Sequence, residues 1–357
     1  WVPNSAGGRP QGRGWRSSEM CGTGHGCGMP RRPGPASPAQ LSATPVPPVL
    51  LARELPFPAV RALLSGGTLT RVRTGAYLAT ELLADRDAHE RLRVLTLARV
   101  RAVSSSLTAD VVVSHLSAAA VWGLPIVTAS TTVHVVSPSR ASARSSSDID
   151  RHWQRLPAND VTEHRGIPVT TLERTVVDCA CALPVREALI LADAALHIGA
   201  DIDSCWRIVG RMKGHRGIRA ARAVLEYADG GSESPGETTA RLAFLRAGLP
   251  RPVTQLAVET RLGTFWVDLG WPEQRVLGEY DGRSKYADAG APAAVVIEEK
   301  RREDALVEQG FRVIRIDADD VRHPETLAAR LRRLGSFPPP ILRPELSLYG
   351  PPRSPLR

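Results

Sequence analysis

The chain has 357 residues, 43% of them hydrophobic, and its 46 lysines and arginines against 37 acidic residues give a formal net charge of +9. This length makes a single domain unusual and allows two modest domains with cores of their own. The positive charge favours a polyanionic partner such as DNA, and five cysteines without a regular spacing argue against a secreted, disulfide-stapled protein.

The first 48 residues are dominated by Gly, Pro, Ser and Arg and show almost no apolar periodicity. This composition predicts a disordered leader over 1–48. The chain begins with Trp1, which suggests a fragment or a misplaced start. The most apolar window, 111–127, is too short and too broken to span a bilayer, so we expect a cytoplasmic protein with no membrane partner.

Structure is expected to begin with a winged-helix-like module over 49–80. Pro58 opens an apolar run that ends at two glycines, which predicts a helix, and alternating residues over 68–77 predict a hairpin. Helix, glycine break and basic hairpin is the arrangement of a winged helix-turn-helix. In that arrangement Arg71 and Arg73 on the wing would reach DNA phosphates or the minor groove.

The next region contains three stretches that carry a family resemblance: SHLSAAAVWGLP over 114–125, VHVV over 133–136 and GIPVTTLERTVVD over 166–178. They resemble successive blocks of AbiEi-type antitoxin proteins. The resemblance covers about 50–200 and implies an operator-binding winged helix, a mixed α/β middle domain over 81–200, and a cognate toxin as a protein partner.

Side chains within the middle region have structural interpretations. His115 follows a serine directly, and adjacent residues cannot form a catalytic triad without a third group and an oxyanion hole, so we expect a polar cap on an apolar helix. Arg174 and Asp178 are spaced as an i,i+4 ion pair. Cys179 and Cys181 lie in an apolar helical run and are expected to be buried.

A basic run lies between the middle region and the C-terminal part. It falls within 201–231, which we interpret as a basic helical linker, and it includes Arg216 and Arg219. Two interpretations stay open for this run: a solvated helix face, and a track for DNA phosphates.

The C-terminal part predicts an α/β core with a mixed sheet covered by helices. The expected elements are a helix over 237–247, strands over 255–259, 264–269 and 275–280, a helix over 295–309 and a strand over 311–316. The Pro-rich end, 336–357, is expected to be disordered.

Two neighbouring strands of this core, within WVDLGWPEQRVLGEYDG, are expected to bring acidic side chains together. Asp268 stands near the end of one strand and Glu279 near the end of the next, and Asp281 shares the face of Glu279 because strand side chains alternate. Like charges held close together oppose folding unless a cation is bound, so these acids indicate a site for a hard divalent metal. Glu237, at the start of the preceding helix, could add a fourth carboxylate.

The same residues carry a second resemblance. SPGETTARL, FWVDLGW, VLGEYDG, EEKRREDALVEQG and FRVIRI, within 232–335, resemble very-short-patch-repair endonucleases of the PD-(D/E)XK superfamily. The resemblance implies that Glu237, Asp268 and Glu279 bind Mg²⁺ (or Mn²⁺). The superfamily places a lysine two residues after the strand glutamate, where this chain has Asp281. A lysine relocated to a neighbouring helix makes Lys300 a candidate catalytic residue and Lys285 a weaker one.

The sequence as a whole predicts an α/β protein, α+β overall, with a winged-helix-like module, a mixed middle domain and a nuclease-type C-terminal domain. The leading hypothesis is a nucleoid-associated protein that hydrolyses DNA phosphodiester bonds with Mg²⁺. Two alternatives stay open: a non-catalytic DNA-binding regulator built on a degenerate nuclease fold, and an antitoxin that neutralises a toxin through its middle domain.

Overall fold

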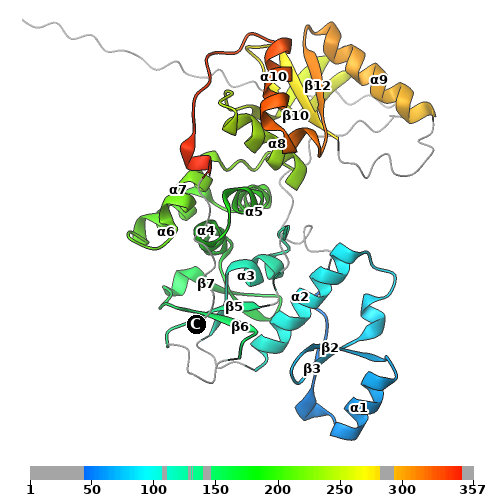
Figure 1. Ribbon diagram of the computed structural model, residues 1–357, viewed down its shortest axis with the longest axis vertical. Helices are drawn as coiled ribbons and strands as arrows, with labels where there is room; N and C mark the ends of the chain where they lie inside the picture. The colour runs from blue at the N-terminus through cyan, green and yellow to red at the C-terminus, as the bar shows by residue number, and fades with distance from the viewer. Residues whose placement is uncertain are drawn as a thin grey trace, which may run out of the picture. The chain divides into compact units, whose positions relative to one another are not determined.

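The computed structural model describes residues 44–106, 111–127, 130, 132–139, 146–281 and 293–347, the last range without the side chains of 293–296. Within these residues, helices accompany three separate sheets of three, five and four strands, which confirms the α+β class (Figure 1). Lys285 and most of the predicted leader lie outside the described residues. Among the described helices, none combines the length and the apolar character that crossing a lipid bilayer demands.

The N-terminal module contains the expected helix and hairpin together with one further strand. Its elements are β1 (Leu50–Leu51), α1 (Phe57–Ser65), β2 (Leu69–Arg73), β3 (Ala76–Ala79) and α2 (Ala88–Ser104). The strands form an antiparallel sheet in the order β1-β3-β2. Gly75 takes φ +73° in the turn between β2 and β3, a conformation that a residue without a Cβ adopts at little cost.

Helix α2 carries two apolar stripes. Its first stripe packs against the hairpin, and its second packs against the middle domain. The first stripe is Val94, Ala98 and Ala102, and the second is Leu97, Val100 and Val103. Spacings of three and four residues keep each stripe on one side of the helix, so this one helix belongs to both cores.

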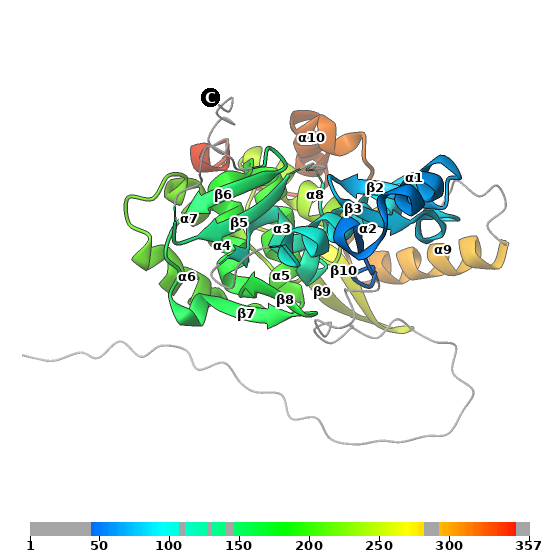
Figure 2. The same ribbon diagram turned by 90° about the horizontal axis from the view of Figure 1, so that it is seen from below.

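The middle domain is built on a five-stranded mixed sheet in the order β6-β5-β4-β8-β7. Its strands and its first helix are β4 (Val112–Val113), α3 (His115–Trp122), β5 (Val133–Ser137), β6 (Ile149–Trp153), β7 (Val161–His164) and β8 (Ile167–Thr170). Strand β5 runs parallel to β6 and antiparallel to β4, and β4 runs parallel to β8. Figure 2 shows the strands of this sheet with α3 against them.

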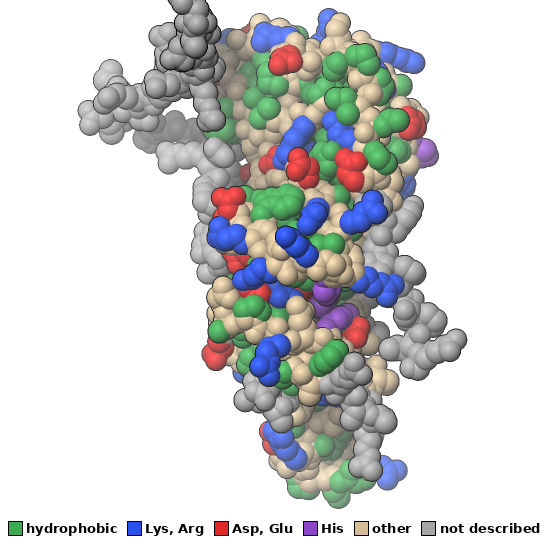
Figure 3. All heavy atoms as spheres, turned by 90° about the vertical axis from the view of Figure 1, so that its left-hand side faces the viewer, with side chains coloured by type: hydrophobic (Ala, Val, Ile, Leu, Met, Phe, Trp, Pro, Cys, Tyr) green, Lys and Arg blue, Asp and Glu red, His purple; other side chains and the backbone are tan. Residues whose placement is uncertain are grey.

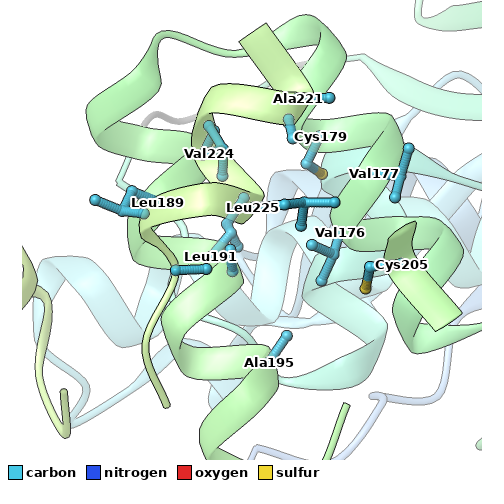
Figure 4. Close-up of a cluster of buried hydrophobic side chains, with 14 of the residues drawn as sticks. Val176, Val177, Cys179, Leu189, Leu191, Ala195, Cys205, Ala221, Val224 and Leu225 are labelled. Carbon is cyan, nitrogen blue, oxygen red and sulfur yellow. The ribbon is translucent and has the colours of Figure 1, made fainter. Parts of the chain in front are cut away.

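A helical layer follows, made of α4 (Leu172–Ala182), α5 (Val185–His197), α6 (Ile202–Arg211) and α7 (Ile218–Tyr227). Its apolar faces enclose one core, drawn in Figure 4, to which Cys179, Cys181 and Cys205 contribute as free, buried thiols. The predicted pair of Arg174 and Asp178 is confirmed, with Nε and Oδ1 2.9 Å apart.

The interpretation of 201–231 as a linker was wrong. Helices α6 and α7, which occupy most of this range, bury Ile208, Val209, Val224 and Leu225 in the core of the helical layer. The basic residues occupy the opposite, exposed sides of these amphipathic helices. The apolar positions recur at helical spacing, but the density of arginines obscured that pattern in the sequence.

The C-terminal domain has the element order that its sequence predicts. It contains α8 (Pro235–Arg246), β9 (Val253–Thr260), β10 (Gly263–Trp271), β11 (Val276–Tyr280), α9 (Ala293–Glu308), β12 (Arg312–Ile316) and α10 (Pro324–Leu334). The sheet order is β12-β11-β10-β9, with β12 parallel to β11 and the other pairs antiparallel. Helices α8 and α10 pack on one face and α9 packs on the other (Figure 1).

Helix α8 is shared between the helical layer and the C-terminal sheet. Leu242 and Leu245 point into the core of the helical layer, whereas Ala240 and Phe244 point into the core beneath the sheet. Gly236, near its start, lies so close to the ring of Tyr280 on β11 that a Cβ atom would come within 2.0 Å of it. The glycine therefore permits the close approach between the start of α8 and the end of β11.

Both chain ends are ordered further than their composition indicates. In the predicted leader, Pro47 is buried and Val46 packs against the middle core. In the predicted tail, Leu346 is fully buried in the core of the helical layer, and its carbonyl oxygen accepts hydrogen bonds from Arg246. The expectation of disorder was therefore wrong for 336–347. Besides Leu346, Phe337 packs against the core beneath the C-terminal sheet, and the N–H of Ile341 donates to the carbonyl of Gly248.

This anchoring predicts a specific loss of stability. Leu346→Ala should lower the free energy of unfolding by roughly 2–3 kcal/mol, the scale for truncating a buried leucine where the surroundings partly relax. Leu342→Ala is the matched control, because Leu342 is 83% exposed and should have almost no effect. Urea denaturation followed by circular dichroism measures both. Equal stability of the two variants would mean that Leu346 does not anchor its segment in the core of the helical layer.

Candidate functional site

The two strand acids of the C-terminal domain lie together, as the sequence predicts. Strands β10 and β11 pair antiparallel with Leu269 opposite Gly278, so the same register brings Asp268 opposite Glu279 on one face. Asp268 Oδ2 accepts a hydrogen bond from the backbone N–H of Tyr280 at 2.8 Å. This bond links the end of β10 to the end of β11 beside the two carboxylates.

Two arginines face these acids. Arg302 of α9 places Nη2 2.9 Å from Glu279 Oε1, although Oε1 is buried without an aligned hydrogen bond. Arg315 on β12 is the parallel-strand partner of Glu279, and its guanidinium lies 3.3 Å from Asp281 and 3.7 Å from Glu279. Among the residues that the structure describes, the cations at this site are thus arginines from α9 and β12.

These groups line a small cavity of about 90 Å³, whose walls are Asp268, Glu279, Tyr280, Asp281, Glu299, Arg302, Glu303 and Arg315. Five carboxylates and two guanidiniums give this lining a formal charge of three negative when every group is ionised. Such an excess in a concave, partly buried site attracts a cation and repels a bare phosphate.

Glu237 belongs to the same acidic group through its electrostatics. Its carboxylate accepts from the N–H of Glu233 and from Ser234 Oγ, each at 2.8 Å, at the start of α8. Burial raises the pKa of Glu237 to about 7, and the negative charge of Asp268 acts in the same direction. The two hydrogen bonds fix the carboxylate at the start of α8, and the charge of Asp268 is the second cause of its raised pKa.

Glu279 is perturbed in the same direction. Burial raises its pKa, the guanidinium groups of Arg302 and Arg315 oppose this rise, and the negative charges of Asp268 and Asp281 add to it. A carboxyl group whose ionised form is disfavoured by both burial and like charge is a ready ligand for a cation, because the cation removes both penalties.

The lysine predictions have a different outcome from the acid predictions. Lys300 is 78% exposed and pairs with Asp304 at 3.8 Å on the outer side of α9, so its place in the catalytic group was wrong. Arg302, two residues further along, points to the acids instead. The signal that could have found Arg302 is the helix phase: Ala305 and Leu306 are buried, and Arg302 lies within about one turn of both on the inner side.

The predicted DNA-binding arginines differ in their surroundings. Arg73 makes a bidentate ion pair with Asp148, at 2.8 and 3.1 Å, and is only 14% exposed, so a partner within the protein already occupies its guanidinium. Arg71 is exposed and donates to Thr74. Arg216 and Arg219 are exposed around the start of α7, where a polyanion can reach them.

Comparison with known proteins gives no established function. The scan against protein-family models matches no family. Two uncharacterized proteins of Mycobacterium tuberculosis, MT2308 and Rv2248, are each 37% identical to this chain over 165 residues. The match covers 44% of this chain and 58% of each relative, so the chain spans somewhat more than half the length of the curated relatives it matches.

The shifted pKa of Glu237 predicts a pH-dependent stability. Its pKa is about 7 in the folded protein against an ordinary value of 4.5, so the folded state holds this proton more tightly than the unfolded state. The contribution to stability is therefore complete below pH 4.5 and is lost as the pH rises through 7. The unfolding free energy of the unmutated protein should fall by roughly 3 kcal/mol relative to Glu237→Gln between pH 4.5 and 8.

Urea titrations of both proteins at each pH measure this difference. Glu273→Gln is the control, because Glu273 is exposed in the turn between β10 and β11, and its pH profile should follow that of the unmutated protein. Parallel profiles for Glu237→Gln and the unmutated protein would contradict the raised pKa of Glu237.

Proposed function

We propose that the C-terminal domain is a Mg²⁺-dependent (or Mn²⁺-dependent) endonuclease that hydrolyses phosphodiester bonds in DNA. One observation carries the proposal: Glu279 Oε1 is buried without an aligned hydrogen bond in a cavity with three more carboxylates than guanidiniums. A buried acceptor without an aligned hydrogen bond is only partly satisfied, here by Arg302 Nη2 at 2.9 Å, and a hard divalent cation would satisfy both the atom and the charge. The resemblance to very-short-patch-repair endonucleases supports the same assignment.

The residues present suit such an ion. Asp268 and Glu279 offer carboxylate oxygens from opposed strands of the cavity wall, and the resemblance implies that Glu237 is the third ligand. A bound Mg²⁺ would supply the positive charge that acidifies water and stabilises the charge developing on phosphate. The carboxylates would hold that charge at the strand ends, and the hydrogen bond from Tyr280 fixes the orientation of Asp268.

Arg302 and Arg315 take the place of the lysine in this proposal. A guanidinium presents a planar fork that matches the oxygens of a phosphate. Arg315 is shared among Glu279, Asp281 and Glu303, so it can exchange a carboxylate for a phosphate oxygen and keep other partners. The two arginines would bind and orient the scissile phosphate.

A second function is favoured by a specific observation: Asp281 occupies the position of the superfamily lysine and holds Arg315 in an ion pair. On this alternative the site is a closed ionic cluster, and the protein is a DNA-binding regulator or an antitoxin that acts with a cognate toxin. Arg71, Arg216 and Arg219 would then bind phosphates, and association with the nucleoid would follow from DNA binding alone.

Metal-dependent cleavage distinguishes the two functions. The full chain should nick plasmid DNA with Mg²⁺ or Mn²⁺, and Asp268→Asn or Glu279→Gln should reduce the rate at least about 100-fold, the scale of losing a ligand that stabilises transition-state charge by several kcal/mol. Lys300→Ala is the control and should keep full activity, because Lys300 points away from the cavity.

Two results would contradict the nuclease proposal. The first is equal cleavage by the unmutated protein and by folded Asp268→Asn, which would identify a contaminant. The second is the absence of any Mg²⁺-induced or Mn²⁺-induced rise in melting temperature in the unmutated protein, since an ion that binds only the folded state must stabilise it. The regulator would then be the better description.

DNA binding itself makes a separate prediction. Arg216→Ala combined with Arg219→Ala should weaken binding to a short duplex and lower the slope of log K against log salt by roughly one unit for each phosphate that is no longer neutralised. Arg73→Ala, which breaks an ion pair with Asp148 and removes no bond to phosphate, should leave the slope unchanged. Fluorescence anisotropy at several salt concentrations measures these slopes. The reverse order of effects would place the DNA on the hairpin.

A further inference from the structure

A second cluster of ligand-type side chains lies on the middle sheet, far along the sequence from the acidic cavity. Strand β5 contributes His134, and strand β6 contributes Asp150 and His152. The parallel register pairs His134 directly with Asp150, and strand alternation puts Asp150 and His152 on the same side of β6. All three side chains therefore project from one face.

The distances among their ligand atoms are those of a metal site. His134 Nδ1 lies 3.2 Å from His152 Nε2, and Asp150 Oδ2 lies 3.5 Å from His134 Nδ1 and 4.0 Å from His152 Nε2. The point equidistant from three atoms with these separations lies about 2.1 Å from each, which is the bond length from Zn²⁺ to imidazole nitrogen or carboxylate oxygen. Among the described residues, this is the group of three ligand atoms that gathers within 4.8 Å.

We propose that His134, Asp150 and His152 bind one divalent transition-metal ion of the zinc class. Two imidazoles and one carboxylate form a ligand set that suits Zn²⁺ and its borderline neighbours better than Mg²⁺, which prefers oxygen ligands alone. Three protein ligands leave a coordination position open to water or to an exchangeable ligand, the pattern of zinc sites that are not purely structural.

The surroundings of the cluster leave it accessible and hold its rings in place. The exposed fraction of the side chains rises from 17% for His134 to 31% for His152 and 46% for Asp150, so an ion can enter from the Asp150 side. Histidine side chains adjoin one another at the surface in Figure 3. Behind them, the ring of His115 stacks on that of His152 with centroids 3.8 Å apart, and Ser114 Oγ lies 3.0 Å from His115 Nδ1.

A hydrogen bond between the two imidazoles explains the 3.2 Å separation of their nitrogens but not the position of the carboxylate. Asp150 Oδ2 lies within 4.0 Å of both rings, although an aspartate half-exposed on an edge strand can turn to water. Among the described strands, β6 pairs with β5 alone, so the ion would fasten the edge strand to its neighbour.

Metal titration of the tag-free full chain tests the proposal. Calorimetry with Zn²⁺ should show one ion bound at this site, and Co²⁺ in its place should give the visible absorption of a low-coordinate nitrogen and oxygen site. Asp150→Asn should weaken Zn²⁺ binding at least about 10-fold, the lower end for loss of a group that supports a metal, and His134→Gln with His152→Gln should abolish the Co²⁺ spectrum. Asp150 is exposed, so its substitution tests the site even where the double variant fails to fold.

Matched controls separate this site from others. His89→Gln changes an exposed histidine of α2 and should leave Zn²⁺ affinity unchanged. Asp268→Asn should also leave it unchanged, which keeps this result independent of the proposed nuclease site. Unaltered Zn²⁺ affinity and an unaltered Co²⁺ spectrum in Asp150→Asn, or the absence of any Zn²⁺ binding by the unmutated protein, would overturn the proposal.

Discussion

A buried ion pair between Asp193 of α5 and Arg241 of α8 holds the candidate nuclease site in its place. Both side chains are almost completely buried, with Arg241 Nη2 2.6 Å from Asp193 Oδ2. Thr238 Oγ1 and the N–H of Asp229 also donate to Asp193, and Arg241 donates to the carbonyl of Tyr227. A buried charge without its partner costs several kcal/mol, so these interactions fix the rotation of α8 and with it the side on which Glu237 lies.

The sequence alone predicted that Asp268 and Glu279 lie together, because their proximity depends on residues that are close in the sequence. Asp268 and Glu279 lie at matching ends of adjacent strands joined by a short turn, and period-two alternation decides their common face. The element order of the C-terminal domain was predicted from its short apolar strands, the turn between them and the resemblance to a known family, because apolar periodicity is weak in α8 and α9. Arg302 was missed because the inner side of α9 depends on which residues the sheet buries.

The histidine cluster and the ordered chain end required information that the sequence does not carry locally. His134 and His152 meet only because β5 and β6 pair in parallel, and parallel pairing is set by a longer connection rather than by a turn. Leu346 is an apolar residue in a Pro-rich segment, and the composition of that segment predicted disorder in spite of it. Arg73 and Asp148 are 75 residues apart in the sequence. Without this distant partner, Arg73 looks like one of the basic residues of a hairpin.

The two candidate metal sites differ in the chemistry of their ligands. The C-terminal cavity offers oxygen atoms and excess negative charge, conditions that suit an ion with strongly held water. The middle-domain cluster offers two imidazoles and one carboxylate, a ligand set that suits a borderline ion. The two proposals thus assign a hard ion and a borderline ion to different sheets of one chain.

Helix α8 has a consequence for how this chain can have been assembled. Its Leu242 and Leu245 complete the core of the helical layer, while its Phe244 meets Trp271 edge to face beneath the C-terminal sheet. A free-standing domain joined end to end with a partner would keep its own core closed. Here the boundary lies within one helix that completes both cores, so neither half keeps a closed core when the chain is divided at α8.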